Sequence, residues 1–274
     1  MIQDILPHRF YNQYDPKREA EDDSIILCFD SGKILVKGEA FPRYREFKQI
    51  EKEMLTYLFS IDEDKQYFLF SDIEMEIPEG YEFVELKKLR DIGFSENYHA
   101  LAAYTGAHLA NWYRDHKFCG RCGKPTFLSG KERAIQCECG NIIYPRIVPA
   151  VIVGVINGDK LLVTKYRTGF AHFALVAGFT EIGETLEETV AREVMEEAGI
   201  RVKNIRYYKS QPWGIVDDIL MGFFCEVDGN PEITMDAEEL KIAEWRSREE
   251  IELQPSDYSL TNEMMKLFKE GKIL

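Results

Sequence analysis

The clearest hydrophobic pattern of the chain lies between Thr185 and Ala198. This stretch contains no Gly or Pro. Apolar side chains recur in it at intervals of four, at Leu186, Val190, Val194 and Ala198. That spacing predicts a helix with one buried face. Gly199 follows directly, and we expect it to cap the C-terminus of the helix.

Apolar runs predict strands on both sides of this helix. After Pro149 the runs cover residues 150–156, 160–166, 206–213, 220–227 and 241–247, and a last helix is expected near residues 259–271. Strand runs interrupted by a helical segment indicate a mixed α/β domain. We assign this domain to residues 149–274.

The first part of the chain has a different pattern. Short strand-like runs cover residues 24–29, 33–38 and 66–71, and one helical stretch is expected near residues 44–60. Asp30-Ser31-Gly32-Lys33, between the first two runs, predicts a hairpin. We interpret residues 1–95 as a separate α+β domain. Residues 96–148 then form a connecting helix, near 96–117, and a cysteine-rich segment.

Composition and charge limit the cellular location and the partners that the protein can have. The chain has 274 residues, a formal net charge of −14 and a pI near 5.0. Such a surface repels phosphate backbones, so general coating of nucleic acid is disfavoured. Neither a membrane-spanning apolar run nor a signal peptide is visible. We therefore expect a cytoplasmic protein without a membrane partner.

The predicted helix carries a group of carboxylates with informative spacing. Glu193, Glu196 and Glu197 are related as i, i+3 and i+4, so they converge on one flank. Like charges at these positions repel, and a hard divalent cation such as Mg²⁺ or Mn²⁺ would reverse that penalty. A solvated acidic helix face is the alternative. It does not account for the Gly-rich loop before the helix or for Arg192 beside the first glutamate.

Residues 178–200 match G-x5-E-x7-R-E-U-x-E-E-x-G-U at every defined position, where U is a bulky aliphatic residue. This segment resembles the Nudix box. The resemblance implies an α/β/α sandwich with a mixed sheet and metal-dependent hydrolysis of a nucleoside diphosphate linked to another moiety. It implies a catalytic metal held by the residues Ala177 (carbonyl), Glu193, Glu196 and Glu197, with Glu196 as ligand or base. Arg192 would orient a box carboxylate, and Glu184 would have a structural role.

Four of the six cysteines cluster in the sequence. Cys119 and Cys122 form a C-x2-C pair, and Cys137 and Cys139 form a C-x-C pair, each followed by Gly. The two pairs predict zinc knuckles around one structural, tetrahedral Zn²⁺. The usual second pair is C-x2-C, so a disulfide pair or a degenerate site remains open, with His116 as a substitute ligand.

A Nudix box preceded by a four-cysteine knuckle and an N-terminal domain resembles the NADH pyrophosphatase branch of the Nudix hydrolases. That branch has a second motif, S-Q-P-W-P-F-P-x-S, and here residues 210–213 match whereas Gly-Ile-Val-Asp-Asp replaces the rest. The resemblance implies substrate contacts at Tyr144, Glu132, Gln211, Pro212, Trp213 and Thr261. It also implies a remote metal carboxylate at Glu239, with Glu238 as the neighbouring alternative, and a homodimer.

These observations predict a zinc-containing enzyme. It would split the pyrophosphate bond of NAD(H) into nicotinamide mononucleotide and AMP, with NAD-capped RNA 5′ ends as a further substrate. One alternative is a Nudix hydrolase for another dinucleotide or a nucleotide sugar such as ADP-ribose, because of the altered second motif. The other, of a different class, is a non-catalytic Nudix nucleotide sensor.

Overall fold

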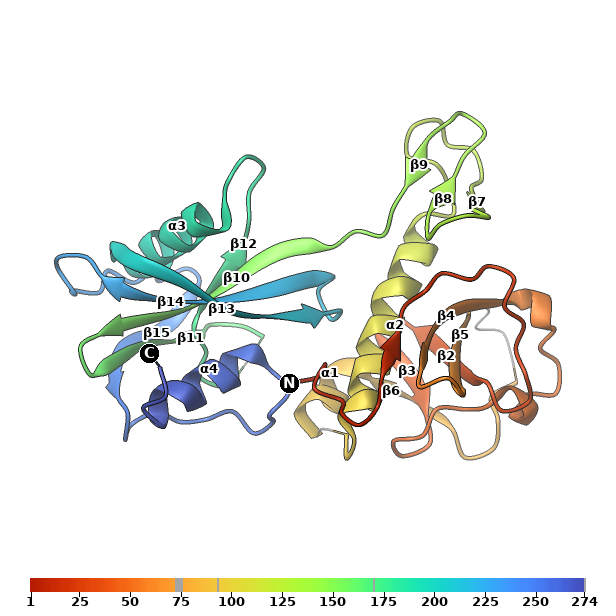
Figure 1. Cartoon of the computed structure of the whole chain (residues 1–274), viewed down its shortest axis with the longest axis horizontal. Helices are drawn as coiled ribbons and strands as arrows, with labels where there is room; N and C mark the ends of the chain where they lie inside the picture. The colour runs from red at the N-terminus through yellow and green to blue at the C-terminus, as the bar shows by residue number, and fades with distance from the viewer. Residues whose placement is uncertain (72–75, 93, 170, 274) are drawn as a thin grey trace. The chain divides into compact units, whose positions relative to one another are not determined.

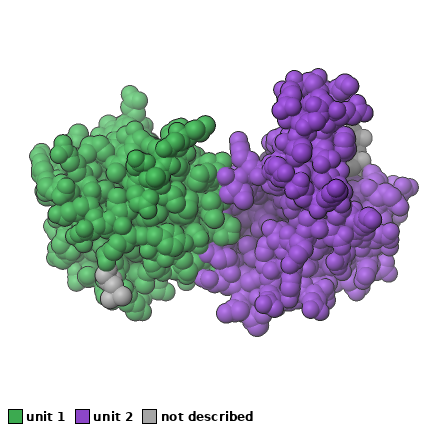
Figure 2. Space-filling view, turned by 45° about the horizontal axis from the view of Figure 1, so that its top comes forward, with its two compact units in different colours: residues 1, 148–212, 218–274 green, residues 2–147, 213–217 purple. Residues whose placement is uncertain are grey.

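The computed structural model describes residues 1–71, 76–92, 94–169 and 171–273. The chain forms two compact units (Figure 2). Unit 1 contains residues 1, 148–212 and 218–274, and unit 2 contains residues 2–147 and 213–217. The three-part division at residues 95 and 148 stays a prediction. None of the described helices is long and apolar enough to cross a membrane.

Unit 1 is a mixed sheet with one helix on each face (Figure 1). Its elements are β10 (Val148–Asn157), β11 (Lys160–Tyr166), β12 (Val176–Phe179), α3 (Leu186–Ala198), β13 (Val202–Trp213), β14 (Asp218–Val227), β15 (Leu240–Ser247) and α4 (Leu260–Lys269). The strand order is β13-β14-β10-β11-β15, and β12 also pairs with β10. The β10–β14 pair is parallel, whereas β10–β11, β10–β12 and β11–β15 are antiparallel.

Successive side chains of β10 pack alternately against α3 on one face of the sheet and α4 on the other. Val151, Val153 and Val155 pack in the cluster that contains Val190 and Val194 of α3. Ile152 packs on the other face, in the cluster that contains Leu260, Met264, Met265 and Phe268 of α4. Successive strand residues point to opposite faces, so one apolar strand supplies both cores. The expected α/β/α sandwich is confirmed.

Helix α3 begins and ends with strong local signals. Thr185 accepts a hydrogen bond from the backbone N–H of Glu188, and the Glu188 side chain accepts from the N–H of Thr185, which is a capping box. Gly199 has φ +70° and donates its N–H to the carbonyl of Met195 at 2.9 Å. The predicted C-terminal cap is confirmed.

Unit 2 contains a larger and a smaller sheet. Its elements are β1 (Phe10–Tyr11), β2 (Ile25–Asp30), β3 (Lys33–Val36), the 3-10 helices η1 (Tyr44–Glu46) and η2 (Lys52–Met54), β4 (Leu55–Ile61), β5 (Lys65–Phe70), β6 (Glu82–Glu85), α1 (Leu86–Ile92), α2 (Asn97–Asp115), β7 (Phe127–Leu128), β8 (Ile135–Gln136) and β9 (Ile142–Ile143). The larger sheet has the order β1-β4-β5-β2-β3-β6, and the smaller one has the order β7-β8-β9. Helix α2 confirms the helix expected near residues 96–117.

Two local predictions in unit 2 had opposite outcomes. The hairpin is confirmed: Asp30 pairs with Lys33, and both Ser31 and Gly32 have positive φ, as a type I′ hairpin turn requires. The helix expected near residues 44–60 is wrong. Only two single-turn 3-10 helices form there, followed by strand β4. Residues 55–61 are rich in aromatic and branched side chains and pair with β5, so sheet pairing overrides the helical spacing.

Candidate active site and zinc ribbon

Arg192 binds three carboxylates of the box. Its Nε and Nη2 donate to the two oxygens of Glu184 at 2.6 and 3.0 Å, and its Nη1 donates to Glu193 at 2.7 Å and to Glu196 at 2.9 Å. Its Nη2 also donates to the carbonyl of Phe179. Hydrogen bonds from Arg192 lower the pKa of Glu184 to about 2. One guanidinium therefore offsets much of the repulsion on this flank of the helix.

Glu193 lies against the backbone of β12 at Gly178. A Cβ at residue 178 would stand 1.9 Å from the carboxyl carbon of Glu193 and 2.0 and 2.2 Å from its oxygens. Any side chain here would displace the carboxylate, so glycine is needed for close approach rather than for a turn. Burial raises the pKa of Glu193, whereas Arg192 lowers it.

Glu197 is the most buried carboxylate of the box, with 2% of its surface exposed. Its Oε1 lies 3.4 Å from the hydroxyl of Tyr166, and its Oε2 has no hydrogen-bond partner in the described part of the chain. Burial raises the pKa of Glu197 to about 8, and the carboxylates of Glu239 and Glu193 add to this shift. A buried carboxylate oxygen without a partner is costly, and a bound cation would remove that cost.

The surrounding donors suit a hard divalent ion. Glu239 raises the pKa of both Glu193 and Glu197, which favours it over Glu238 as the remote carboxylate. The backbone of Ala177 is also close to Glu197, and its N–H lowers the pKa of that carboxyl. All these donors are oxygens, the set that Mg²⁺ and Mn²⁺ prefer. The residues therefore fit such an ion.

The three box glutamates do not converge on one point in this arrangement. Among the residues that the structure describes, only the four cysteines place three or more Cys, His, Asp or Glu ligand atoms within 4.8 Å of one another. Glu196 is instead 59% exposed and paired with Arg192. Its predicted role as ligand or base stays a prediction.

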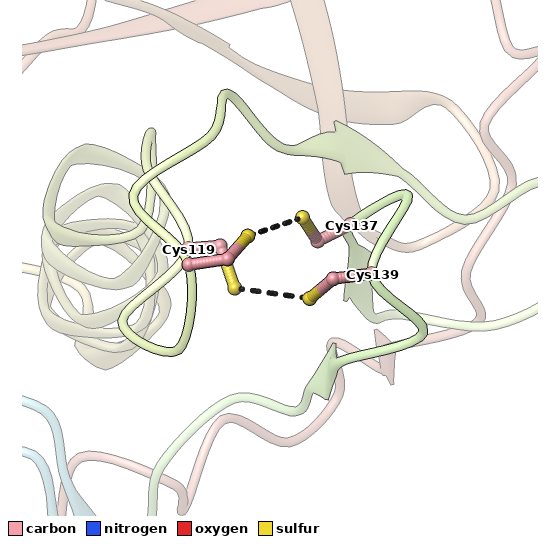
Figure 3. A group of neighbouring side chains, drawn as sticks. Cys119, Cys137 and Cys139 are labelled. Carbon is pink, nitrogen blue, oxygen red and sulfur yellow. Dashed lines mark hydrogen bonds between the residues drawn. The ribbon is translucent and has the colours of Figure 1, made fainter.

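The four cysteines meet at one point (Figure 3). The Sγ atoms of Cys119 and Cys139 are 3.7 Å apart, and those of Cys122 and Cys137 are 3.5 Å apart. Tetrahedral zinc with Zn–S bonds of about 2.3 Å places sulfurs about 3.8 Å apart, so the cluster fits zinc. The shorter C-x-C turn reaches the site as well as the C-x2-C turn does.

Tight turns build the cysteine cluster. Gly123 donates its N–H to the carbonyl of Cys119, and Gly140 donates to that of Cys137, both glycines having positive φ. The backbone N–H of Arg121 lowers the pKa of Cys119, whereas neighbouring thiols raise the pKa of Cys137. His116 donates from Nδ1 to the carbonyl of Trp112 in its own helix at 2.7 Å, and it lies outside the ligand set.

The predicted substrate contacts in the ribbon lie side by side. The hydroxyl of Tyr144 donates to Oε1 of Glu132 at 3.1 Å, and the Tyr144 side chain is 55% exposed. That hydrogen bond raises the pKa of Tyr144. The pair is accessible, and its role in substrate binding stays a prediction.

Gln211 and Thr261 lie inside unit 1. Gln211 is fully buried, its Nε2 donates to the carbonyl of Tyr258 at 2.6 Å, and its Oε1 accepts from the N–H of Leu260 at 2.8 Å. Gln211 therefore holds the start of α4. Thr261, in the first turn of that helix, is 8% exposed.

The segment that replaces the family's second motif packs in unit 2. Pro212 is exposed at the end of β13, and the ring of Trp213 lies 5.9 Å from that of Tyr104 on α2. A Cβ at Gly214 would stand 2.2 Å from the carbonyl oxygen of Tyr104. The glycine of the Gly-Ile-Val-Asp-Asp segment thus permits close packing on α2.

Asp217 makes the polar contacts of this loop. Its carboxylate lies 3.7 Å from Nε2 of His108 and 3.4 Å from Nη2 of Arg146. Asp217 has φ +60°, a conformation that Asp tolerates better than most residues. The loop is therefore held by charge as well as by the close approach at Gly214.

Sequence reasoning missed Tyr166 and Arg167. Tyr166 lies 3.4 Å from Glu197, and Arg167 donates from Nε to the carbonyl of Ala237 at 2.5 Å and from its N–H to the carbonyl of Glu239 at 3.1 Å. Both contacts join segments about 30 to 70 residues apart. No local signal reveals them.

Two known domain families match this chain, one over the mixed sheet of unit 1 and one over the cysteine cluster. The NUDIX domain family matches residues 145–268, and the NADH pyrophosphatase zinc ribbon domain matches residues 114–144. The chain therefore contains a NUDIX domain and, before it in the sequence, a zinc ribbon domain of the kind found in NADH pyrophosphatases.

Relatives named NAD-capped RNA hydrolase NudC are similar over part of their length. The Citrobacter koseri protein is 45% identical over 157 residues, and the Klebsiella pneumoniae protein is 45% identical over 158 residues. Each match covers 56% of this chain and 60% of the relative. The chain therefore matches somewhat less than two thirds of these relatives. A NUDIX hydrolase from Nitrosomonas europaea is 23% identical with a TM-score of 0.49, over 56% of this chain and 91% of that one.

Proposed function

We propose that the chain hydrolyses the pyrophosphate bond of NAD(H) and releases nicotinamide mononucleotide and AMP. The observation that carries this proposal is Glu197, whose buried Oε2 has no partner within the described residues and whose pKa is raised to about 8. Such a group is typical of a functional site rather than of a solvated helix face. The adjoining zinc ribbon and the names of the relatives point to NAD(H) as the substrate.

The box residues have distinct proposed roles. Glu193, Glu197, Glu239 and the carbonyl of Ala177 would hold Mg²⁺ or Mn²⁺, with Glu196 as a further ligand or the base. A cation held by these residues would supply charge neutralisation on the pyrophosphate and a lower pKa for the attacking water. Arg192 keeps Glu193 oriented through the 2.7 Å hydrogen bond. Gly178 lets the carboxylate reach β12.

We propose Tyr144 as a stacking platform, with Glu132, Pro212, Trp213 and Thr261 as further contacts. The zinc ion has a structural role in this account. Gln211 would act through the start of α4, since both ends of its amide bind backbone there.

NAD-capped RNA 5′ ends are a further proposed substrate. The relatives named NAD-capped RNA hydrolase support this, and the net charge of −14 disfavours strong contacts along the RNA body. A homodimer in the cytoplasm completes the proposal.

Hydrolysis of another dinucleotide, such as ADP-ribose, is the second candidate. The loop at residues 213–217 favours it, because Ile215 stands where the branch has an aromatic residue and the loop packs on α2. Loss of a stacking partner costs about 1–3 kcal/mol per base. A non-catalytic sensor is disfavoured by the intact set of box carboxylates.

Glu197→Gln tests the proposal. With NADH and Mg²⁺, this variant should lose turnover about a thousandfold, because several kcal/mol of transition-state stabilisation depend on the site. Glu187→Gln, on the exposed side of the same helix, is the matched control and should keep wild-type activity. Chromatography of the products measures both. Undiminished NADH cleavage by Glu197→Gln would refute the assignment of the site.

A further inference from the structure

We propose that Tyr166 and Arg167, at the end of β11, are positioning residues that hold Glu197 and Glu239 for one shared cation. The proposal rests on the proposed function, because it concerns the same metal site. Glu197 belongs to α3, whereas Glu239 lies in the loop before β15. Nothing in the local sequence of either element fixes the distance between these two carboxylates.

A β-bulge at this point changes the course of β15. Lys165 pairs with Ile242 and Tyr166 pairs with Leu240, so Lys241 is the extra residue. Bulges bend the strand that carries the extra residue and are common beside active sites. Here the bulge lies directly after the loop that carries Glu239.

Arg167 binds this loop at two positions. Its Nε donates to the carbonyl of Ala237 at 2.5 Å, and its backbone N–H donates to the carbonyl of Glu239 at 3.1 Å. The two carbonyls flank Glu238, so the loop is held on both sides of that residue. These two hydrogen bonds fix the backbone at Glu239, whose side chain is exposed.

Tyr166 contacts the buried end of the site. Its hydroxyl lies 3.4 Å from Oε1 of Glu197. The phenol can donate its proton to this oxygen. With Oε1 directed at Tyr166, Oε2 is the atom left for a cation.

Two adjacent residues thus bind the two separate elements of the site, Tyr166 at the carboxylate of Glu197 and Arg167 at the backbone of the loop that carries Glu239. Partners of this kind orient metal ligands, and their removal typically lowers metal affinity or activity 10–100-fold. Neither residue touches the cation or the substrate in this account. Their effect should therefore appear in metal binding itself, before any chemistry.

A titration of the whole chain with Mn²⁺ tests the proposal. Electron paramagnetic resonance measures the concentration of free Mn²⁺ and so gives the Kd. Tyr166→Phe and Arg167→Met should each raise the Kd for Mn²⁺ about tenfold. Tyr207→Phe and Arg201→Met, at exposed positions of the same unit, are the controls and should bind like the wild type. Tyr166→Phe removes a single oxygen, so it serves as a test even if Arg167→Met does not fold.

A double-mutant test distinguishes a positioning role of Arg167 from general destabilisation of the fold. If Arg167 acts through Glu239, Arg167→Met should not weaken Mn²⁺ binding further in a Glu239→Gln background. A full tenfold loss in that background would overturn its proposed role, and unchanged Kd values in both single variants would overturn the whole inference. Weaker Mn²⁺ binding in a protein that does not cleave NADH would support positioning while refuting the proposed substrate.

Discussion

The cysteine cluster fits a zinc ion and the acidic box is proposed to hold a divalent cation, and the two are organised in opposite ways. The cysteine sulfurs already lie 3.5–3.7 Å apart, because two short turns bring them together. The carboxylates of the box stay separated, with Glu196 on Arg192 and Glu197 buried. A structural site can be specified by local turns. A site that must also admit a substrate depends on contacts between distant elements.

The largest effect is expected at the cysteine cluster. Cys137→Ser should remove the zinc, roughly one ion per chain, and unfold the ribbon, because such sites supply folding energy outright. Elemental analysis and hydrogen exchange of residues 117–144 measure the loss. Cys28→Ala, a buried cysteine outside the cluster, should keep its zinc. A folded, zinc-free ribbon would contradict the structural role.

Gly178→Ala should cause the next largest effect. The new methyl group would overlap the Glu193 carboxylate, which stands 1.9 Å from the Cβ position, and displace it. A shift of about 1 Å can cost 10²-fold in rate. Steady-state NADH cleavage measures this, with Gly130→Ala, where a Cβ meets nothing within 4 Å, as control. Equal rates would show that the close approach is dispensable.

The burial of Glu197 should appear as a pH dependence of stability. Its pKa is 4.5 in the reference state and about 8 in the fold, so the folded chain retains a proton that the unfolded chain loses between these values. Its contribution to the free energy of unfolding therefore falls as pH rises from about 5 to about 8.

Without Mg²⁺ or Mn²⁺, Glu197→Gln should therefore be about 2–4 kcal/mol more stable than the wild type at pH 8, with the difference vanishing near pH 4. Urea unfolding across this range measures it. Glu187→Gln should show no such trend. A constant difference at all pH values would contradict the raised pKa.

The smallest effect is expected from a neighbour of the cysteine cluster. The Nδ2 atom of Asn141 lies 3.6 Å from Sγ of Cys119, a long contact, and the backbone N–H of Arg121 also faces that sulfur. Asn141→Ala should keep its zinc and lose under about 1 kcal/mol of stability. The rate of zinc transfer to a chelator measures this. Loss of the ion would mean that the cluster, like the box, depends on single contacts.

Local signals in the sequence predicted much of the molecule. The period of four in α3, its terminal Gly199 and the apolar runs of the strands after residue 149 are short-range patterns, and the structure has them as expected. The cysteine spacing likewise predicted the cluster, including the shortened second pair.

Long-range packing accounts for what the sequence did not reveal. The strand at residues 55–61 forms because β5 is available to pair with it, which a helical spacing cannot reveal. Gln211 was predicted from a motif, yet its amide binds the start of α4. The contact of Tyr166 with Glu197 joins β11 to α3, and no pattern within either element encodes it.

Product analysis with a panel of substrates tests the central claim most directly. The purified chain, with Mg²⁺ or Mn²⁺, would be given NADH, NAD⁺, ADP-ribose and diadenosine polyphosphates in parallel, and the products separated by chromatography. We predict that NADH or NAD⁺ is cleaved fastest, to the mononucleotide and AMP. Faster cleavage of another substrate, or no cleavage of any, would contradict the account.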